Sequence, residues 1–224
     1  RMVNGNARER DPASATPPTT RPVTGPPPRQ GLYDPWYEHD ACGVGFVVHV
    51  KGKPSHEIVR QGIEILLRLN HRGAVGAEAN TGDGAGMLLQ IPYTFFGKVC
   101  GQHEINLPQP GQYGVGFISL PPDPEQRRNC ERLFESILVE EGQTMLGWRT
   151  VPTDNSMIGA AAKASEPFMR QVFIGRNPSL PDEAAFERKL YVIRQRALNE
   201  IRHSSLNGSQ YWYAASLSAR TIVY

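Results

Sequence analysis

Cysteine is scarce in this sequence, and the few cysteines present are not paired. Among 224 residues there are three, at positions 42, 100 and 130, and no Cys-x-x-Cys motif occurs. The six histidines likewise lack the His-x3-His spacing of many metal sites. An odd, unpaired set of cysteines fits a reducing compartment and argues against a zinc site. We therefore expect no protein-bound metal.

Long apolar stretches and an excess of one charge are also missing. No stretch approaches the ~18 consecutive apolar residues that suggest a membrane span, and the N-terminal segment lacks the apolar core of a signal peptide. The formal net charge of +2 and the sequence pI of about 8.5 are too balanced to indicate nucleic-acid binding. We expect a cytoplasmic protein that binds neither membranes nor nucleic acid.

Nucleotide-binding fingerprints are a third absence. The segment Gly82-Asp83-Gly84-Ala85-Gly86 has the pattern Gly-x-Gly-x-Gly and precedes its apolar strand. A dinucleotide-binding loop is Gly-x-Gly-x-x-Gly after a strand, and a P-loop needs a Gly-Lys-Ser/Thr that does not occur here. A nucleotide-binding oxidoreductase is therefore disfavoured. The glycine segment remains either a tight turn that feeds a strand or a loop that contributes backbone to an active site.

What the sequence does contain falls into two parts. Residues 1–30 are rich in proline, with Thr, Ser and Arg between, and cannot bury enough apolar surface to offset their ordering entropy. Residues 31–40 add aromatic side chains, so we expect them to pack against something. We interpret residues 1–41 as a disordered leader or propeptide and residues 42–224 as one domain. Because the sequence opens at Arg1 and stops at Tyr224 within an apolar run, we expect a fragment.

The residue periodicity after position 42 predicts strands with helices between them. Helices are expected over residues 55–69, 123–141 and 182–201, with Ser55, Asp123 and Asp182 at their starts. Gly62 would allow the first helix to approach the sheet closely. Strands are expected over residues 44–50, 87–91, 113–120, 145–151, 168–174, 211–218 and 221–224. This order favours an α+β fold or mixed α/β layers.

Cys42 lies where the proline-rich leader meets the first expected strand. If the chain is cut before Cys42, its thiol and a free α-amino group share one residue. An α-amine titrates near pH ~7.7–8, so it is substantially unprotonated at neutral pH and can serve as a base. A terminal nucleophile that carries its own base is established for threonine. The alternative is a buried thiol packed as a small apolar residue, which we expect of Cys130 on the inward face of its helix.

Arg72 follows His71 where the first expected helix ends. Its planar guanidinium offers a two-pronged donor for a carboxylate, which is how a small amino acid can be held. The alternative is that the pair of basic residues only favours the helix dipole. The sequence alone leaves both interpretations open.

Five ordered blocks resemble the N-terminal part of large subunits of the glutamate synthase family, from about residue 31 to the end. The Ala41-Cys42-Gly43 junction is shared with other class II glutamine amidotransferases, whereas the glycine segment and the last block point to glutamate synthase. The blocks are residues 31–35, 38–46, 71–74, 81–86 and 216–224.

The resemblance implies an α+β fold of the N-terminal nucleophile hydrolase type, a four-layer αββα sandwich that is incomplete in this fragment. It implies that a propeptide ending at Ala41 is removed, that Cys42 attacks L-glutamine to form a thioester, and that Arg72 holds the substrate carboxylate. The released ammonia would aminate 2-oxoglutarate in a domain absent from this chain. The chain itself would hold no cofactor. FMN and an iron–sulfur cluster would belong to the complete large subunit, and FAD and NADPH to a small-subunit partner.

The resemblance implies that this chain is incomplete, because two functional features of the family, an Asn-Gly pair and the aspartate that holds the substrate amino group, are expected further downstream. The Asn-Gly pair expected to stabilise the thioester oxyanion lies in an Asn-Gly-Glu segment, which Asn207-Gly208-Ser209 does not match. Loss of an oxyanion donor costs ~10²–10³ in turnover in other hydrolases, so we expect little or no activity from the fragment alone. A non-catalytic interaction module and another class II amidotransferase remain the alternative interpretations.

Overall fold

The computed structural model describes residues 28–35, 43–69, 78, 80–82 and 84–224. The chain divides into two compact units, residues 1–41 and residues 42–224. In the first unit, Gln30 and Tyr33 exchange two backbone hydrogen bonds of 3.0 Å around a turn. The described helices of the chain include none that is both long and apolar enough to cross a membrane.

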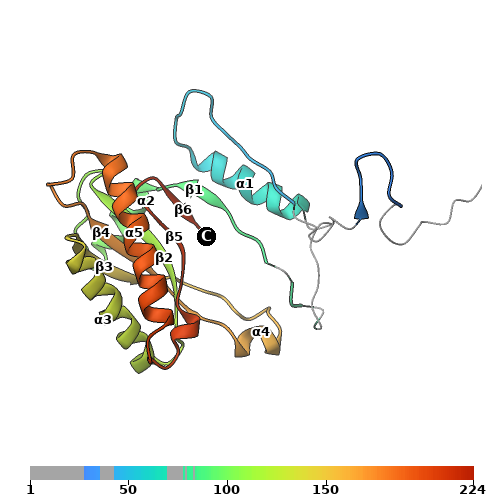
Figure 1. The fold of residues 1–224 in the computed structure, drawn as a ribbon. Helices are drawn as coiled ribbons and strands as arrows, with labels where there is room; N and C mark the ends of the chain where they lie inside the picture. The colour runs from blue at the N-terminus through green and yellow to red at the C-terminus, as the bar shows by residue number, and fades with distance from the viewer. Residues whose placement is uncertain (1–27, 36–42, 70–77, 79, 83) are drawn as a thin grey trace, which may run out of the picture. The chain divides into compact units, whose positions relative to one another are not determined.

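The second unit is built on a four-stranded antiparallel sheet in the order β3-β4-β2-β5 (Figure 1). Its strands are β2 (Tyr113–Leu120), β3 (Thr144–Thr150), β4 (Phe168–Gly175) and β5 (Tyr213–Ser218). Four strands were expected here at nearly these positions, and the expectation is confirmed. The last begins two residues later than expected because residues Ser209–Tyr211 form a short 3-10 helix, η3.

Helices α3 (Pro124–Glu140) and α5 (Glu183–Arg202) contact each other and cover one face of this sheet. Both begin where the sequence predicts, because Asp123 and Asp182 accept hydrogen bonds from backbone N–H groups of the first turn. The inward faces are also as predicted, and Gly142 ends α3 with φ +73°. Fully buried side chains on the two helices are Cys130, Phe134, Ile137, Leu138, Phe186, Leu190, Ile193, Ala197 and Ile201.

The opposite face of the sheet carries a second apolar core. It is covered by α2 (Tyr93–Gly101), a helix that the sequence did not predict, and by a two-stranded antiparallel sheet of β1 (Leu88–Gln90) and β6 (Thr221–Val223). Phe96 of α2 packs edge-on against Phe173 of β4, with ring centroids 5.2 Å apart. Both side chains are fully buried. The sheet is therefore covered on both faces, which makes the fold mixed α/β with antiparallel sheets.

Residues 43–50 differ from the expectation of a buried strand. Within the described part of the chain, residues 43–49 pair with no strand, and Val44, Phe46, Val48 and Val50 are 71–97% exposed. A β-strand is stabilised by its ladder partner and by burial of one face, and neither is provided here. The prediction of a buried strand is wrong for the structure as described.

Helix α1 (His56–Arg68) begins as predicted, since the Ser55 hydroxyl accepts a hydrogen bond of 3.1 Å from the Glu57 N–H. Its apolar face was predicted less well. Ile63 and Leu67 were expected to point inward but are 48% and 68% exposed, and no residue of α1 is fully buried. This helix lies against other segments with only part of its apolar surface.

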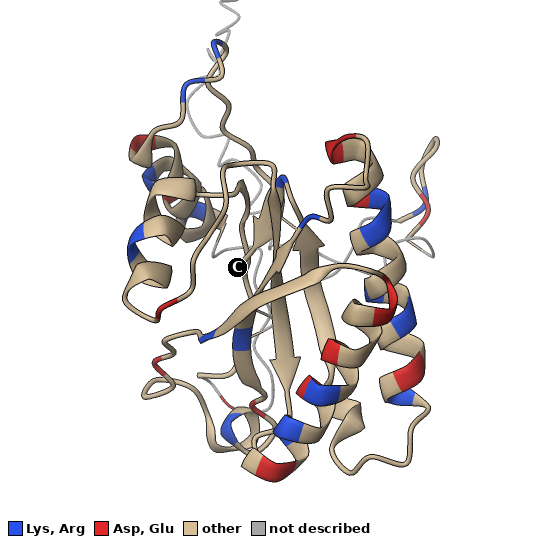
Figure 2. Cartoon of the chain, turned by 90° about the vertical axis from the view of Figure 1, so that its left-hand side faces the viewer, with Lys and Arg blue, Asp and Glu red and all other residues tan. Residues whose placement is uncertain are grey.

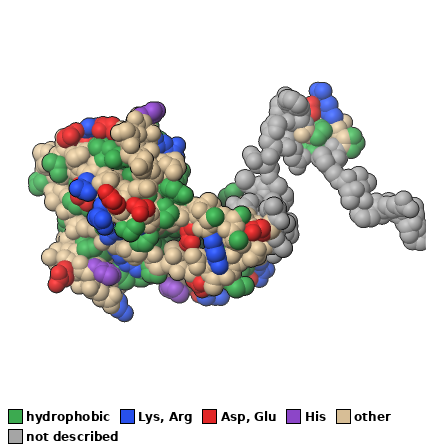
Figure 3. All heavy atoms as spheres, turned by 90° about the horizontal axis from the view of Figure 1, so that it is seen from below, with side chains coloured by type: hydrophobic (Ala, Val, Ile, Leu, Met, Phe, Trp, Pro, Cys, Tyr) green, Lys and Arg blue, Asp and Glu red, His purple; other side chains and the backbone are tan. Residues whose placement is uncertain are grey.

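Charged side chains follow the helices instead of the sheet. Figure 2 shows Lys and Arg alternating with Asp and Glu along the helices, whereas the strands carry few charges. The face seen in Figure 3 has acidic, basic and apolar side chains intermixed, without a large patch of one sign. This face offers no basic stripe of the kind that nucleic acid requires.

Candidate active site

The two predicted site residues, Cys42 and Arg72, lie outside the described residues. The structure does describe the segments that flank them, which are residues 43–50 after Cys42 and residues 78–86 after Arg72, apart from positions 79 and 83. The surroundings of the site can therefore be built from these flanks.

The segment after Cys42 is held by α1. A Cβ atom on Gly45 would lie 2.5 Å from Cγ2 of Ile65, so only glycine lets the chain approach the helix this closely. Val47 is the one partly covered apolar side chain of residues 43–50. The helix thus shields one side of this segment and leaves the other side open.

Helix α1 is in turn packed against the start of β1. A Cβ atom on Gly62 would lie 2.7 Å from Sδ of Met87, so the close approach predicted at Gly62 is confirmed. Met87 and Tyr224 exchange two backbone hydrogen bonds, of 2.8 and 3.0 Å. The segment after Cys42, α1, β1 and β6 consequently form one chain of contacts.

The glycine segment leads directly into β1, as expected of a turn that feeds a strand. Gly84 has φ +85°, a left-handed conformation that favours glycine. A Cβ atom on Gly86 would lie 2.9 Å from the carbonyl oxygen of Tyr224, which is backbone and cannot rotate away. Asp83 lies outside the described residues. Whether this segment also contributes to a site stays a prediction.

A joint that the sequence did not reveal connects residues 78–81 to the start of α4 (Ala160–Ala164). Both carboxylate oxygens of Glu78 lie within hydrogen-bonding distance of the Ala161 N–H, at 3.3 and 3.2 Å. The side-chain amide of Asn80 donates to the Met157 carbonyl at 3.3 Å. We name Glu78, Asn80 and Thr81 together with residues 157–161 the Glu78 joint. Its partners are 83 residues apart, so no local pattern could have predicted it.

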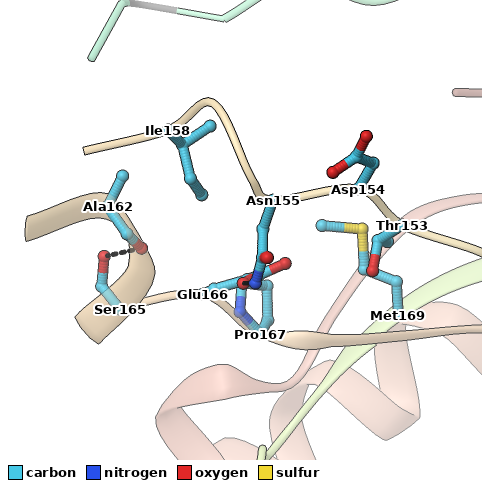
Figure 4. Close-up of a pocket in the computed structure, with 9 residues that line it drawn as sticks. All are labelled: Thr153, Asp154, Asn155, Ile158, Ala162, Ser165, Glu166, Pro167 and Met169. Atoms are coloured by element: carbon cyan, nitrogen blue, oxygen red, sulfur yellow. Dashed lines mark hydrogen bonds between the residues drawn. The ribbon is translucent and has the colours of Figure 1, made fainter. Parts of the chain in front are cut away.

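A cavity of about 450 Å³ opens beside α4 (Figure 4). Its polar lining includes Asp154, Asn155, Ser165 and Glu166, and Asn155 donates a hydrogen bond of 2.7 Å to Glu166. Among the described residues that line the cavity there is no lysine or arginine, whereas Asp154 and Glu166 are both acidic. The described lining therefore offers no cation to a substrate carboxylate.

A buried polar row ties the end of β6 to the four-stranded sheet. Arg149 Nη1 donates to Gln171 Oε1 at 2.8 Å, and Gln171 Nε2 donates to the Tyr224 hydroxyl at 2.5 Å. Gln171 is fully buried and Arg149 is 9% exposed. Burial raises the pKa of Tyr224, so its hydroxyl stays protonated at neutral pH. The row is a structural link between the two sheets.

The two described cysteines are unsuited to nucleophilic chemistry. Cys100 and Cys130 are fully buried, unpaired thiols. Burial raises the pKa of Cys100 to about 11 against a smaller opposing effect of Arg149, and it also raises the pKa of Cys130. Because the thiolate is the nucleophilic form, both remain unreactive at neutral pH. The prediction that Cys130 is packed on the inward face of its helix is confirmed.

Among the described residues, no group of three or more His, Cys, Asp or Glu side chains could hold a metal ion. Acidic side chains near the candidate site are engaged with the protein itself, as Glu78 is with α4. The described chemistry near the site is therefore that of hydrogen bonds and apolar packing.

The comparisons with known proteins agree with this picture. The family model of class-II glutamine amidotransferases matches residues 42–224. The glutamate synthase [NADPH] large chain of Bacillus subtilis is 49% identical over 198 residues, covering 88% of this chain and 13% of the relative. The glutamate synthase [NADH] of Schizosaccharomyces pombe is 41% identical, covering 88% of this chain and 9% of the relative. The ferredoxin-dependent glutamate synthase 2 of Synechocystis is 33% identical, covering 86% and 12%.

This chain spans about an eighth or less of the length of these relatives. The family match, in contrast, covers more than half of the chain and starts at the cysteine that the sequence singles out. The chain therefore belongs to the class-II glutamine amidotransferase family.

Proposed function

We propose that residues 42–224 form part of the glutaminase domain of a glutamate synthase, with Cys42 as the nucleophile. The observation that carries this proposal is that the family match begins at Cys42 while the other two cysteines are buried thiols with raised pKa values. Among the three cysteines, Cys42 is the one at the start of the domain.

The proposed chemistry uses the N-terminal residue twice. After removal of residues 1–41, the free α-amine of Cys42 takes the thiol proton, and the thiolate attacks the side-chain amide carbon of L-glutamine. The amine then gives its proton to the leaving nitrogen, the C–N bond breaks, and ammonia departs from a glutamyl thioester. Water adds to the thioester and the C–S bond breaks, which releases glutamate and restores the thiol.

Arg72 is proposed to bind the α-carboxylate of glutamine. A guanidinium forms two parallel hydrogen bonds with a carboxylate and holds it more firmly than a lysine would. Arg72 follows the end of α1 by four residues, and Ile65 of α1 lies against Gly45 in the segment after Cys42, which supports a role of Arg72 near that segment. None of the described residues that line the cavity beside α4 is a lysine or an arginine, and the cavity is not assigned to this task.

The complete domain is proposed to be a four-layer αββα sandwich. Helices α3 and α5 form one outer layer, and the β3-β4-β2-β5 sheet forms the next. The β1-β6 sheet lies over the other face of that sheet, and α1 packs against Met87 at the start of β1. This order supports α1 as part of the second helical layer, with the segment after Cys42 joining the β1-β6 sheet in the complete domain.

The full-length protein is proposed to be cytoplasmic and to use the ammonia in the reductive amination of 2-oxoglutarate. The relatives are named for NADPH, NADH or ferredoxin. We assign the NADPH type on the identity with the Bacillus subtilis large chain, with FMN and an iron–sulfur cluster in the rest of the large subunit and FAD in a small subunit. The cysteine spacing and glycine segment of this chain suit none of these groups, so no step here runs through them.

The test is the substitution Cys42→Ser in the full-length protein with its partner subunit. Glutamine-dependent glutamate synthesis should fall by about 10³-fold or more, in the range seen when a catalytic nucleophile is removed. Synthesis from high concentrations of ammonia should persist, because it bypasses the thioester. Cys100→Ser should leave glutamine use within a factor of two. Full glutamine-dependent activity in Cys42→Ser would instead favour a non-catalytic interaction module.

A further inference from the structure

Arg149 is the one lysine or arginine among the described residues that is buried, at 9% exposed. An arginine stays protonated in proteins, so this side chain carries a positive charge below the surface of the domain. A buried charge is unfavourable unless an opposite charge and hydrogen bonds compensate it. The contacts of its guanidinium show how much of this compensation the described chain supplies.

The guanidinium of Arg149 has a single hydrogen-bond acceptor among the described residues. Arg149 on β3 lies directly opposite Gln171 on β4, and its Nη1 donates to Gln171 Oε1 at 2.8 Å. This acceptor is a neutral amide. The Nε atom is buried without an acceptor, and no described aspartate or glutamate forms an ion pair with Arg149. The described chain therefore leaves most of the five N–H donors of this charge unused.

Arg170, in the same sheet, shows the ordinary arrangement. Its Nη1 lies 2.7 Å from Oε1 of Glu131, and the two side chains are 21% and 11% exposed. Here the chain supplies both members of a largely buried ion pair. Arg149 differs from Arg170 in that its carboxylate partner is missing from the described residues.

The groups next to Arg149 add a further donor and a loose cover. Gln171 Nε2 donates to the Tyr224 hydroxyl, and that hydroxyl donates to no acceptor among the described residues. The ring of Phe95 lies 5.8 Å from Cζ of Arg149, near the ~6 Å limit of a cation–π contact, and Phe95 is 45% exposed. The row from Arg149 to Tyr224 thus has donors in excess and lies under a partly exposed ring, which suits an anion.

We propose that Arg149 binds a carboxylate through Nε and Nη2. These two donors share one edge of the guanidinium, which matches the two oxygens of a carboxylate. The carboxylate comes either from an acidic side chain of polypeptide outside this chain, which covers 13% of its Bacillus subtilis relative, or from a small free carboxylate. The inference goes beyond the proposed function, because no step at Cys42 uses Arg149.

The first experiment is thermal unfolding of this chain in sodium chloride that is replaced stepwise by sodium formate at constant ionic strength. A ligand that binds the folded state alone raises the Tm. Formate should raise the Tm of the parent by about 3 °C and the effect should saturate. Arg149→Met should abolish this rise. Arg149→Lys keeps the charge without the two-pronged geometry and should retain less than about half of the rise.

The behaviour in chloride alone separates the two arginines. Arg149→Met should be at least as stable as the parent, because it removes a buried charge that has no described counter-ion. Arg170→Met is the matched control. It should lower the Tm in both salts, because Glu131 is left buried without its partner, and it should keep the full rise with formate.

Hydrogen exchange of the full-length protein, followed by mass spectrometry of peptides that contain β3, distinguishes the two sources of the carboxylate. If an acidic side chain occupies the site, formate should have no effect, and Arg149→Met should speed amide exchange in β3 by about fivefold. If the site takes a free carboxylate, formate should slow exchange in the parent and leave exchange in Arg149→Met unchanged.

Three results would overturn the inference. One is a parent chain whose Tm does not respond to formate. Another is an equal response in the parent and in Arg149→Met, which would be a general salt effect. The third is a response in this chain together with β3 amides in the full-length protein that change neither with formate nor with Arg149→Met, which would indicate an adventitious ion only. Glutamine use is no readout in these experiments, so their outcome leaves the test of Cys42 unaffected.

Discussion

The body of the domain, residues 88–224, and its N-terminal flank, residues 43–69, differ in how far they bury their apolar side chains. In the body, the strands β2 to β5 and the helices α3 and α5 bury many of their apolar side chains completely, as Phe134 and Ile193 illustrate. In the flank, Phe46 is 87% exposed and α1 has no fully buried residue. The body is stabilised by its own contacts, whereas the flank that carries the proposed nucleophile is held by a few close approaches at glycines.

The largest loss of stability is expected from Phe134→Ala in the body, and measuring it would sharpen this comparison. Phe134 is fully buried and packs against Trp148 and Trp212, with ring centroids 5.7 and 6.2 Å away. Removing such a ring leaves a cavity and costs ~3–5 kcal/mol. Urea unfolding followed by circular dichroism would measure it. A loss below 1 kcal/mol would mean that the core collapses around the vacancy or is less tightly packed than described.

A moderate, pH-dependent loss of thermal stability is expected from Glu141→Gln, at the point where α3 meets α5. Glu141 forms ion pairs with Lys189 at 2.8 Å and Arg196 at 2.7 Å, and these hydrogen bonds lower the pKa of its carboxyl. A lowered folded-state pKa gives stability that is present above the unfolded-state pKa and is lost as the pH falls through the folded-state value.

Both cations are about one-third exposed, so solvent screens part of the attraction. We expect Glu141→Gln to lower the Tm at pH 7 by about 2 °C and the difference to shrink toward zero as the carboxyl of the parent is protonated in acid. Thermal unfolding at a series of pH values would measure this. A difference that does not change with pH would contradict the ion-pair explanation.

The smallest change in the free energy of unfolding is expected from Phe46→Ser in the flank. Because the side chain is mostly exposed in this chain, its removal should change the free energy of unfolding by less than about 0.5 kcal/mol. The same urea titration as for Phe134→Ala provides the comparison. A loss above 2 kcal/mol would show that Phe46 is buried and that the two regions are alike.

The sequence predicted the body of the domain better than its N-terminal flank. Helices α3 and α5 were predicted with their caps and inward faces because long amphipathic segments with Asp at the start carry strong local signals. Residues 44–50 were predicted as a buried strand because their composition is that of one. Burial and pairing, however, depend on partners from elsewhere, and the composition of a segment does not specify them.

The features that the sequence did not predict also depend on distant partners. Helix α2 has no side-chain cap and contains Gly97, so its local propensity is weak and packing on the sheet determines it. The Glu78 joint and the Arg149–Gln171–Tyr224 row depend on contacts between distant residues. For the candidate site, the sequence could single out Cys42 from its junction and Arg72 from a family block, but the contacts of the described segments that follow them emerge only from the fold.

The most direct test of the central claim is mass spectrometry of the full-length protein after treatment with a glutamine-like alkylating agent, 6-diazo-5-oxo-L-norleucine. We predict one adduct, on a mature chain whose first residue is Cys42, formed in step with the loss of glutamine-dependent activity and prevented by excess glutamine. Modification of Cys100 or Cys130 in place of Cys42, or full activity in a sample that retains residues 1–41, would contradict the assignment of Cys42 as an N-terminal nucleophile.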